Sequence, residues 1–113
     1  MKHELRLHPD PFESIANGDK TIECRVFDEK RQAISLGDQI MFINREGGVT
    51  IHVRVIGLLH YQTFKDLFTY TDLDKSCSPG FTVESATDAM LQFYTLDDQL
   101  RHGVLGIEFV LVG

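Results

Sequence analysis

Apolar and polar residues alternate along several stretches of this chain, with the period of two that is typical of half-buried β-strands. The first stretch covers residues 2–8 and ends at a Pro-Asp-Pro turn, because proline cannot donate to a strand ladder. Similar patterns predict further strands at residues 20–25, 39–44, 49–55 and 104–112. Gly47 and Gly48 permit the positive φ values of a tight turn, so the strands on either side should form a hairpin.

The period changes to that of a helix in shorter segments. Residues 11–18 are expected to form a short helix that ends at Gly18, and apolar spacing predicts two more helices over residues 63–68 and 82–94. A further helical turn is expected over residues 95–103. The segment 70–80 is rich in Thr, Asp, Ser, Pro and Gly, so we expect a surface loop, which is a common location of binding residues.

These elements predict the α+β class, in the form of a small β-barrel of five or six mostly antiparallel strands with flanking short helices. A closed barrel has no exposed strand edges, which favours it over the alternative, an open α+β sheet. A length of 113 residues is enough for one core but hardly for two. We therefore expect a single domain over residues 1–113.

Composition and charge limit the expected partners. No apolar run approaches the roughly 20 residues of a membrane-spanning helix, and residues 1–7 lack an apolar signal core, so we expect a cytoplasmic protein without a membrane partner. The net charge of −6 disfavours non-specific binding to DNA or RNA, because such binding depends on neutralising phosphates. A local basic pocket of Arg6, Lys20 and Arg25 would still allow a nucleotide or a short RNA loop to bind.

Other residue types indicate little further chemistry. The five histidines have no metal-binding spacing and no P-loop is present, so neither a metal site nor a cofactor is predicted. Cys24 and Cys77 lack C-x-x-C spacing and are expected to be free thiols. Among the aromatic residues, Tyr61 and Tyr70 are the better candidates for stacking on a base, whereas Phe93 fits an apolar core stripe.

The densest candidate chemistry lies in residues 17–25, where a glycine turn begins a strand that carries three ionisable groups. A strand places Thr21, Glu23 and Arg25 on one face, and Lys20 can reach that face from the strand end. Lysine and arginine supply hydrogen-bond donors, while glutamate supplies an acceptor or a general base. The cluster could therefore clamp an anionic or amide-bearing ligand, although a solvated ion pair is the alternative interpretation.

Around these residues the chain resembles the ASCH domain, a family of small proteins with a barrel similar to that of RNA-binding PUA domains. Residues 18–25 match the pattern G-x-K-x-x-E-x-R, and the segments 36–40 and 103–108 extend the resemblance over nearly the whole chain. The resemblance implies a PUA-like β-barrel with a cleft into which Lys20, Glu23 and Arg25 project. It also implies a role in binding RNA or a nucleotide-like ligand.

Some ASCH-like proteins are amidohydrolases that remove the acetyl group of N4-acetylcytidine, using a lysine, a threonine three residues later and a distant glutamate. Here Lys20 is the lysine, but Glu23 occupies the position of the threonine and Thr21 is the nearest hydroxyl. Attack by water with Glu23 as the base would preserve the chemistry, with Asp74 or Glu84 as the distant acid.

Three functions follow as alternatives. The first is a module that binds RNA or a nucleotide through Arg6, Lys20, Thr21, Glu23 and Arg25. The second is a small hydrolase, either an amidohydrolase or a ribonuclease, with Lys20 and Glu23 as its catalytic residues. The third is a scaffold for protein interaction. Neither the ligand nor the oligomeric state follows from the sequence.

Overall fold

The computed structural model describes residues 1–77 and 80–112 of the chain. Its strands in this part of the chain are β1 (Lys2–Leu7), β2 (Ile22–Val26), β3 (Gln39–Asn44), β4 (Thr50–Tyr61) and β5 (Val104–Leu111). Its helices there are α1 (Pro9–Ala16), α2 (Glu29–Gln32), α3 (Phe64–Tyr70), α4 (Leu73–Ser76), α5 (Val83–Met90) and α6 (Leu96–His102). Within these residues no helix has the length and apolar character needed to cross a bilayer.

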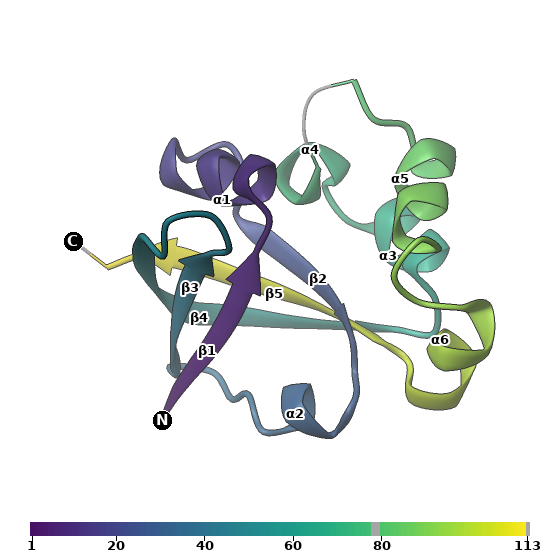
Figure 1. The fold of residues 1–113 in the computed structure, drawn as a ribbon. Coiled ribbons are helices and arrows are strands. Elements are labelled where there is room, and N and C mark those ends of the chain that lie inside the picture. The colour runs from purple at the N-terminus through teal and green to yellow at the C-terminus, as the bar shows by residue number, and fades with distance from the viewer. Residues whose placement is uncertain (78–79, 113) are drawn as a thin grey trace.

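The strands form one mixed sheet in the order β1-β3-β4-β5-β2 (Figure 1). β1 pairs with β3 in parallel, and the other three pairs of neighbouring strands are antiparallel. The sheet curls into a half-barrel, and a hydrogen bond of 3.1 Å from Arg25 Nη2 of β2 to the Arg6 carbonyl of β1 links its two edge strands. The predicted α+β barrel is confirmed in this form, with an opening between β1 and β2 that we call the seam.

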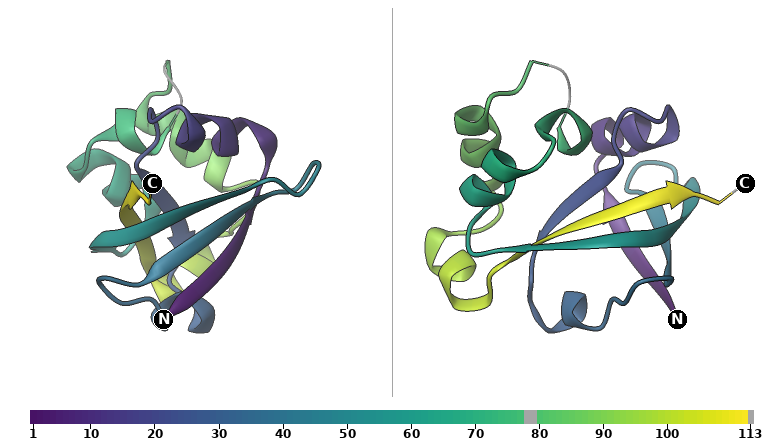
Figure 2. Two further views of the ribbon diagram at one scale, coloured as in Figure 1. Left: turned by 90° about the vertical axis from the view of Figure 1, so that its left-hand side faces the viewer. Right: turned by 180° about the vertical axis from the view of Figure 1, so that it is seen from behind.

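Two apolar clusters stabilise the sheet from opposite faces. The first fills the inside of the curl and includes Leu5, Phe42 and Ile107, with Phe12 and Ile15 of α1 at one end. The second lies between the sheet and the helices and consists of Ile22, Cys24, Val26, Phe64, Leu67, Phe68, Ala86 and Val104. Helices α1, α3, α4 and α5 gather at one end of the sheet, as both views in Figure 2 show. Strand β2 lies between the two clusters.

Register on β2 determines where its charged residues face. Glu23 and Arg25 pair with Ile107 and Leu105, which belong to the cluster inside the curl. The apolar residues that alternate with them belong to the cluster under the helices. The predicted alternation on this strand therefore sends Glu23 and Arg25 toward the seam and leaves the opposite face to apolar packing.

Several element boundaries differ from the prediction. The segment 70–80 contains the one-turn helix α4, and the part of this expected loop at residues 78–79 lies outside the described residues. Strand β4 continues to Tyr61, because its pairing with β5 resumes after a register shift between Val55 and Gly57. Residues 29–32 form the helical turn α2, whose cap, Asp28, accepts a hydrogen bond from the Arg31 amide.

Candidate functional site

Lys20, Glu23 and Arg25 form a buried ionic triad at the start of β2. Glu23 is its centre: Oε1 lies 3.3 Å from Lys20 Nζ, and Oε2 accepts a hydrogen bond of 3.2 Å from Arg25 Nη2. The side chains of Lys20 and Glu23 are only 9% and 8% exposed, and that of Arg25 is 16% exposed. The two cations thus share one carboxylate in a place that excludes most water.

Contacts from three other elements hold the triad in position. Lys20 Nζ donates a 2.6 Å hydrogen bond to the carbonyl of Ser76 at the end of α4. The Lys20 amide donates to Ser14 of α1, after a turn in which Gly18 adopts a φ of 88° that most residues avoid. With the bond from Arg25 to the Arg6 carbonyl, these contacts fix the triad between α1, α4 and the edge strand β1.

Attraction between these groups keeps Lys20 and Glu23 in their charged forms although both are buried. Burial lowers the pKa of Lys20 and is the largest single effect on it, but the Glu23 carboxylate and, to a smaller extent, Cys24 and Cys77 together raise that pKa above its ordinary value. Burial likewise raises the pKa of Glu23, but Lys20 and Arg25 together hold it below the ordinary value. Lys20 and Glu23 are therefore both charged near neutral pH, and with the Arg25 guanidinium they form a site with one acceptor and several donors.

The triad lies where two hollows meet. The first, which we call the cleft, has a volume of about 260 Å³ and is lined by Arg6, Leu7, His8, Arg45, Phe93 and Tyr94 together with Arg25. The second, the helix-side hollow, also has a volume of about 260 Å³ and is lined largely by apolar residues, including Phe68, Phe81, Ala86 and Ala89. The cleft and the helix-side hollow share five lining residues, which are Pro11, Lys20, Glu23, Cys24 and Met90. A ligand in either hollow would contact Lys20 and Glu23.

The structure brings together some of the predicted site residues and separates others. Arg6 and Arg25 line the cleft with Lys20 and Glu23. Thr21 lines neither hollow, and its backbone instead bonds to Lys75 and Phe109. Asp74 and Glu84, the two expected distant acids, are exposed and also line neither hollow.

Sequence reasoning missed Arg45, Phe93 and Asp10. Arg45 follows β3 and donates its amide to the Leu7 carbonyl, so the parallel pairing of β3 with β1 delivers it to the cleft. Phe93 was expected in an apolar core stripe, but it lies beyond the end of α5 and is 61% exposed in the cleft, with its ring centre 6.0 Å from that of His8. Asp10 supplies a carboxylate to the helix-side hollow.

The two expected stacking residues do not reach the cleft. Tyr61 and Tyr70 stack on each other with ring centres 6.2 Å apart and planes 11° apart, and neither lines a hollow beside the triad. Phe93 is the exposed phenyl ring in the cleft, whereas Phe81, which is 41% exposed, lines the helix-side hollow.

Neither thiol near the triad is activated. Cys24 and Cys77 are free cysteines. Burial raises the pKa of Cys24 to about 12 and also raises the pKa of Cys77, so both remain protonated near neutral pH. Within residues 1–77 and 80–112, no group of three His, Cys, Asp or Glu side chains is placed to hold a metal ion.

Comparison with known proteins agrees with this architecture. The family model of the ASCH domain matches residues 5–111. The crystal structure of the hypothetical protein PH0355 is 33% identical with a TM-score of 0.90 and covers 99% of this chain and 100% of its own. The solution structure of PF0455 from Pyrococcus furiosus is 30% identical with a TM-score of 0.80, covering 99% of this chain and 98% of its own.

More distant structures share the fold. The crystal structure of an ASCH protein from Zymomonas mobilis is 14% identical with a TM-score of 0.66, covering 95% of this chain and 65% of its own. A search of curated proteins finds no match. The family model spans almost the whole chain and the same curled sheet recurs in these structures, so this chain belongs to the ASCH domain family.

Proposed function

We propose that this ASCH domain binds a single base of an RNA or of a nucleotide-like molecule in the cleft. The observation that carries this proposal is the buried ionic triad at the cleft floor. Lys20 and Arg25 offer donors and Glu23 offers a carboxylate acceptor within one small volume. The edges of nucleobases carry donors and acceptors side by side, so such a mixed set can recognise one.

Two further features support a base as the ligand. Phe93 presents an exposed ring beside the triad, and base–aromatic stacking contributes about 1–3 kcal/mol for each base. The cleft volume of about 260 Å³ lies just below the range of roughly 300–1,000 Å³ that is typical of sites for drug-sized ligands. A site of this size suits one base with its sugar better than a long stretch of polynucleotide.

Burial of the triad also argues for a ligand-binding role. Burying charges is costly, and an apolar replacement of similar volume is often neutral or stabilising, so packing alone does not explain a buried ion cluster. Ionisable groups with strongly shifted pKa values in a hollow are characteristic of functional sites. Lys20 and Glu23 line two hollows, and burial together with the neighbouring charges shifts the pKa of each.

Hydrolysis of an amide on a modified nucleoside is the second candidate function, and the buried ammonium of Lys20 favours it. A fixed positive charge can stabilise an oxyanion that develops on a substrate carbonyl. The apolar helix-side hollow could receive a small acyl group next to that charge. The lowered pKa of Glu23 makes its carboxylate a weaker general base in the free protein. Ligand binding is therefore the first candidate function and hydrolysis the second.

The test is a screen of the four ribonucleosides, N4-acetylcytidine and short single-stranded RNAs, scored by thermal shift and by product release. A ligand at 100 times its Kd should stabilise the fold by about 2.7 kcal/mol, which gives a clear rise in Tm. Lys20→Met and Glu23→Gln should abolish the shift, whereas Lys65→Met and Glu84→Gln should retain it, because these control residues are exposed and line neither hollow.

The outcomes of this screen separate the alternatives. A thermal shift without product supports the binding module. Product release that depends on Lys20 and Glu23 but hardly on Thr21 would establish a hydrolase of the second kind. The absence of any shift over the whole set would refute the proposal and favour the protein-interaction scaffold.

A further inference from the structure

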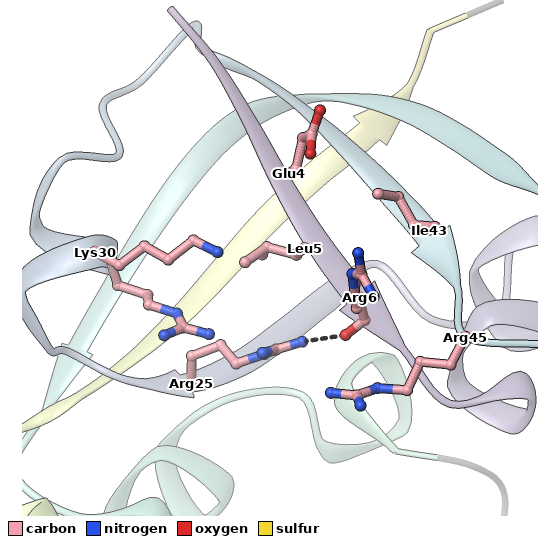
Figure 3. A pocket seen from close by; sticks show the side chains of 8 residues that line it. Glu4, Leu5, Arg6, Arg25, Lys30, Ile43 and Arg45 are labelled. Atoms are coloured by element: carbon pink, nitrogen blue, oxygen red, sulfur yellow. Dashed lines mark hydrogen bonds between the residues drawn. The ribbon is translucent and has the colours of Figure 1, made fainter. Parts of the chain in front are cut away.

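Cations gather in a further hollow along the seam, which shares Arg25 with the ionic triad. This hollow has a volume of about 240 Å³ and is lined by Arg6, Arg25, Lys30, Arg31 and Arg45, together with Glu4, Leu5 and Ile43. Figure 3 shows Lys30 and Arg25 extending toward β1 from one side and Arg45 from the other. The five cations come from β1, β2, α2 and the residue after β3, so only the folded chain brings them together.

Most of this positive charge has no acidic partner. Arg25 is paired with Glu23 at 3.2 Å and Arg31 with Asp28 at 2.9 Å. Within residues 1–77 and 80–112, no ion pair involves Arg6, Lys30 or Arg45, and Glu4 is the one carboxylate that lines this hollow. The chain has 11 lysines and arginines and a net charge of −6, so five cations in one hollow are a marked local excess.

Such a cluster fits an anion with several oxygens. Like charges held close together repel one another, and an anion between them relieves that repulsion. Guanidinium groups bind phosphate through two parallel hydrogen bonds, and lysine adds a point charge. Arg6 and Arg45 approach from neighbouring strands and Lys30 from α2, which surrounds such a group on several sides.

The hollow along the seam and the cleft share three arginines. Arg6, Arg25 and Arg45 line both hollows, and Arg25 bonds to Glu23 of the triad and to the Arg6 carbonyl of β1. One ligand could therefore contact both places at once. A base lying on the triad would have its phosphate within reach of the seam.

We propose that the seam binds a phosphate group, so that the preferred ligand of this protein is a phosphorylated nucleoside rather than a free one. This inference rests on the proposed function for the place of the base, while the phosphate site itself rests on the seam residues. The phosphate has two possible sources, a free mononucleotide or an internal phosphodiester of single-stranded RNA. Lys30 and Arg31 of α2 then belong to the ligand site.

Lys30 offers the cleanest probe of the seam, because it lines the seam hollow and not the cleft. Isothermal titration at low salt compares one nucleoside from the screen with its 5′- and 3′-monophosphates and with a trinucleotide that contains it. Phosphorylation should raise the affinity of the wild-type protein at least about tenfold, since charge-assisted contacts are the strong ones. Lys30→Gln should lower the affinity for the phosphorylated ligands about fivefold to tenfold and leave that for the nucleoside unchanged.

The double variant Arg6→Gln/Arg45→Gln should bind these ligands more weakly still. For this variant, the slope of the logarithm of the binding constant against the logarithm of the salt concentration should be shallower. The slope should change by about one unit for each phosphate group that the variant no longer neutralises. Arg54→Gln is the matched control, because Arg54 is an exposed arginine on β4 that lines neither hollow. It should bind every ligand as the wild type does. Circular dichroism checks that each variant is folded.

Ribose 5-phosphate, which has no base, separates the two proposals. If ribose 5-phosphate binds, and Lys30→Gln or the double variant weakens that binding, the phosphate site at the seam is supported. This holds even if Lys20→Met has no effect on nucleoside binding, a result that would count against the proposed base site alone. Tighter binding of the trinucleotide than of both monophosphates identifies RNA as the source of the phosphate, and equal binding identifies a free nucleotide. The inference is overturned if phosphorylation adds no affinity, or if the seam variants behave as Arg54→Gln does.

Discussion

Replacing Glu23 by glutamine should destabilise this fold more than the loss of either cation of the triad. The Glu23 carboxylate is the shared partner, 3.3 Å from Lys20 Nζ and 3.2 Å from Arg25 Nη2, so its loss leaves two buried cations without an anion. Removing one partner of a buried pair typically costs about 3–5 kcal/mol. Ordinary domains have a total stability of about 5–15 kcal/mol, so this loss is large.

Lys20→Met should cost less, about 2 kcal/mol, which is typical for the removal of a hydrogen bond to a charged group. Arg25 still neutralises Glu23 in this variant, and the main losses are the ion pair and the hydrogen bond to the Ser76 carbonyl. The double variant Lys20→Met/Glu23→Gln should lose less than the two single losses combined. The coupling between contacting residues of one network is about 0.5–3 kcal/mol.

Urea unfolding at pH 7, followed by circular dichroism, measures these differences. With a slope of about 1–3 kcal/mol per molar urea, Glu23→Gln should lower the midpoint by at least about 1 M. Glu84→Gln, at an exposed position on α5, is the control and should stay within about 0.5 kcal/mol of wild type. A Glu23→Gln midpoint equal to that of the control, or a larger loss in Lys20→Met, would refute the view that Glu23 holds the triad together.

The ion pair of Lys20 and Glu23 also predicts how the stability of the fold depends on pH. The pKa of Glu23 is lowered by folding, so its contribution is present above the usual value of 4.5 and is lost as the pH falls through the folded-state pKa. The pKa of Lys20 is raised, so its contribution is present below the usual value of 10.5 and is lost as the pH rises through the folded-state pKa. The advantage of wild type over the double variant should therefore be greatest between these values and shrink at both ends.

Three further measurements address single residues. Phe93→Ala should weaken binding of the base by about 1–3 kcal/mol in a titration and leave the urea midpoint nearly unchanged, because the ring is exposed. A hydrogen bond from His3 and one from the Ser35 amide lower the pKa of Asp38 to about 2, so the stability difference between wild type and Asp38→Asn should shrink as the pH falls from 3.8 toward that value. Cys24, with a pKa of about 12, should react with iodoacetamide at pH 8 only after unfolding, and rapid labelling of the native protein would contradict this expectation.

The local parts of this structure could be predicted from the sequence because local rules govern them. The alternation of apolar and polar residues predicted β1 and β3. The glycine pair Gly47-Gly48 predicted the turn before β4, and these residues have φ values of 84° and 74°. The same alternation separated Glu23 and Arg25 from the apolar face of β2. These features depend only on neighbouring residues and on the pleat of a strand.

Long-range pairing determines what the sequence did not reveal. Arg45 reaches the cleft only because β3 runs parallel to β1, and neither strand carries a signal for that partner. Phe93 continues the helical spacing of the apolar residues before it, which predicts a buried side chain. Helix α5 ends at Met90, however, so Phe93 lies outside the helix and is exposed. Thr21 lies next to the site in sequence, but its backbone bonds to Lys75 and Phe109 hold it away from the hollows.

The charge distribution offers a reason for the choice of ligand. A net charge of −6 repels long polynucleotides, whereas the seam concentrates five cations beside a cleft large enough for one base. A short phosphorylated ligand would meet the seam without bringing many phosphates close to the acidic surface. A longer RNA would bring further phosphates close to that surface, which repels them. Affinity is therefore expected to rise from nucleoside to nucleotide and to level off after a few residues, and a steady rise with RNA length would point to a basic surface beyond the seam.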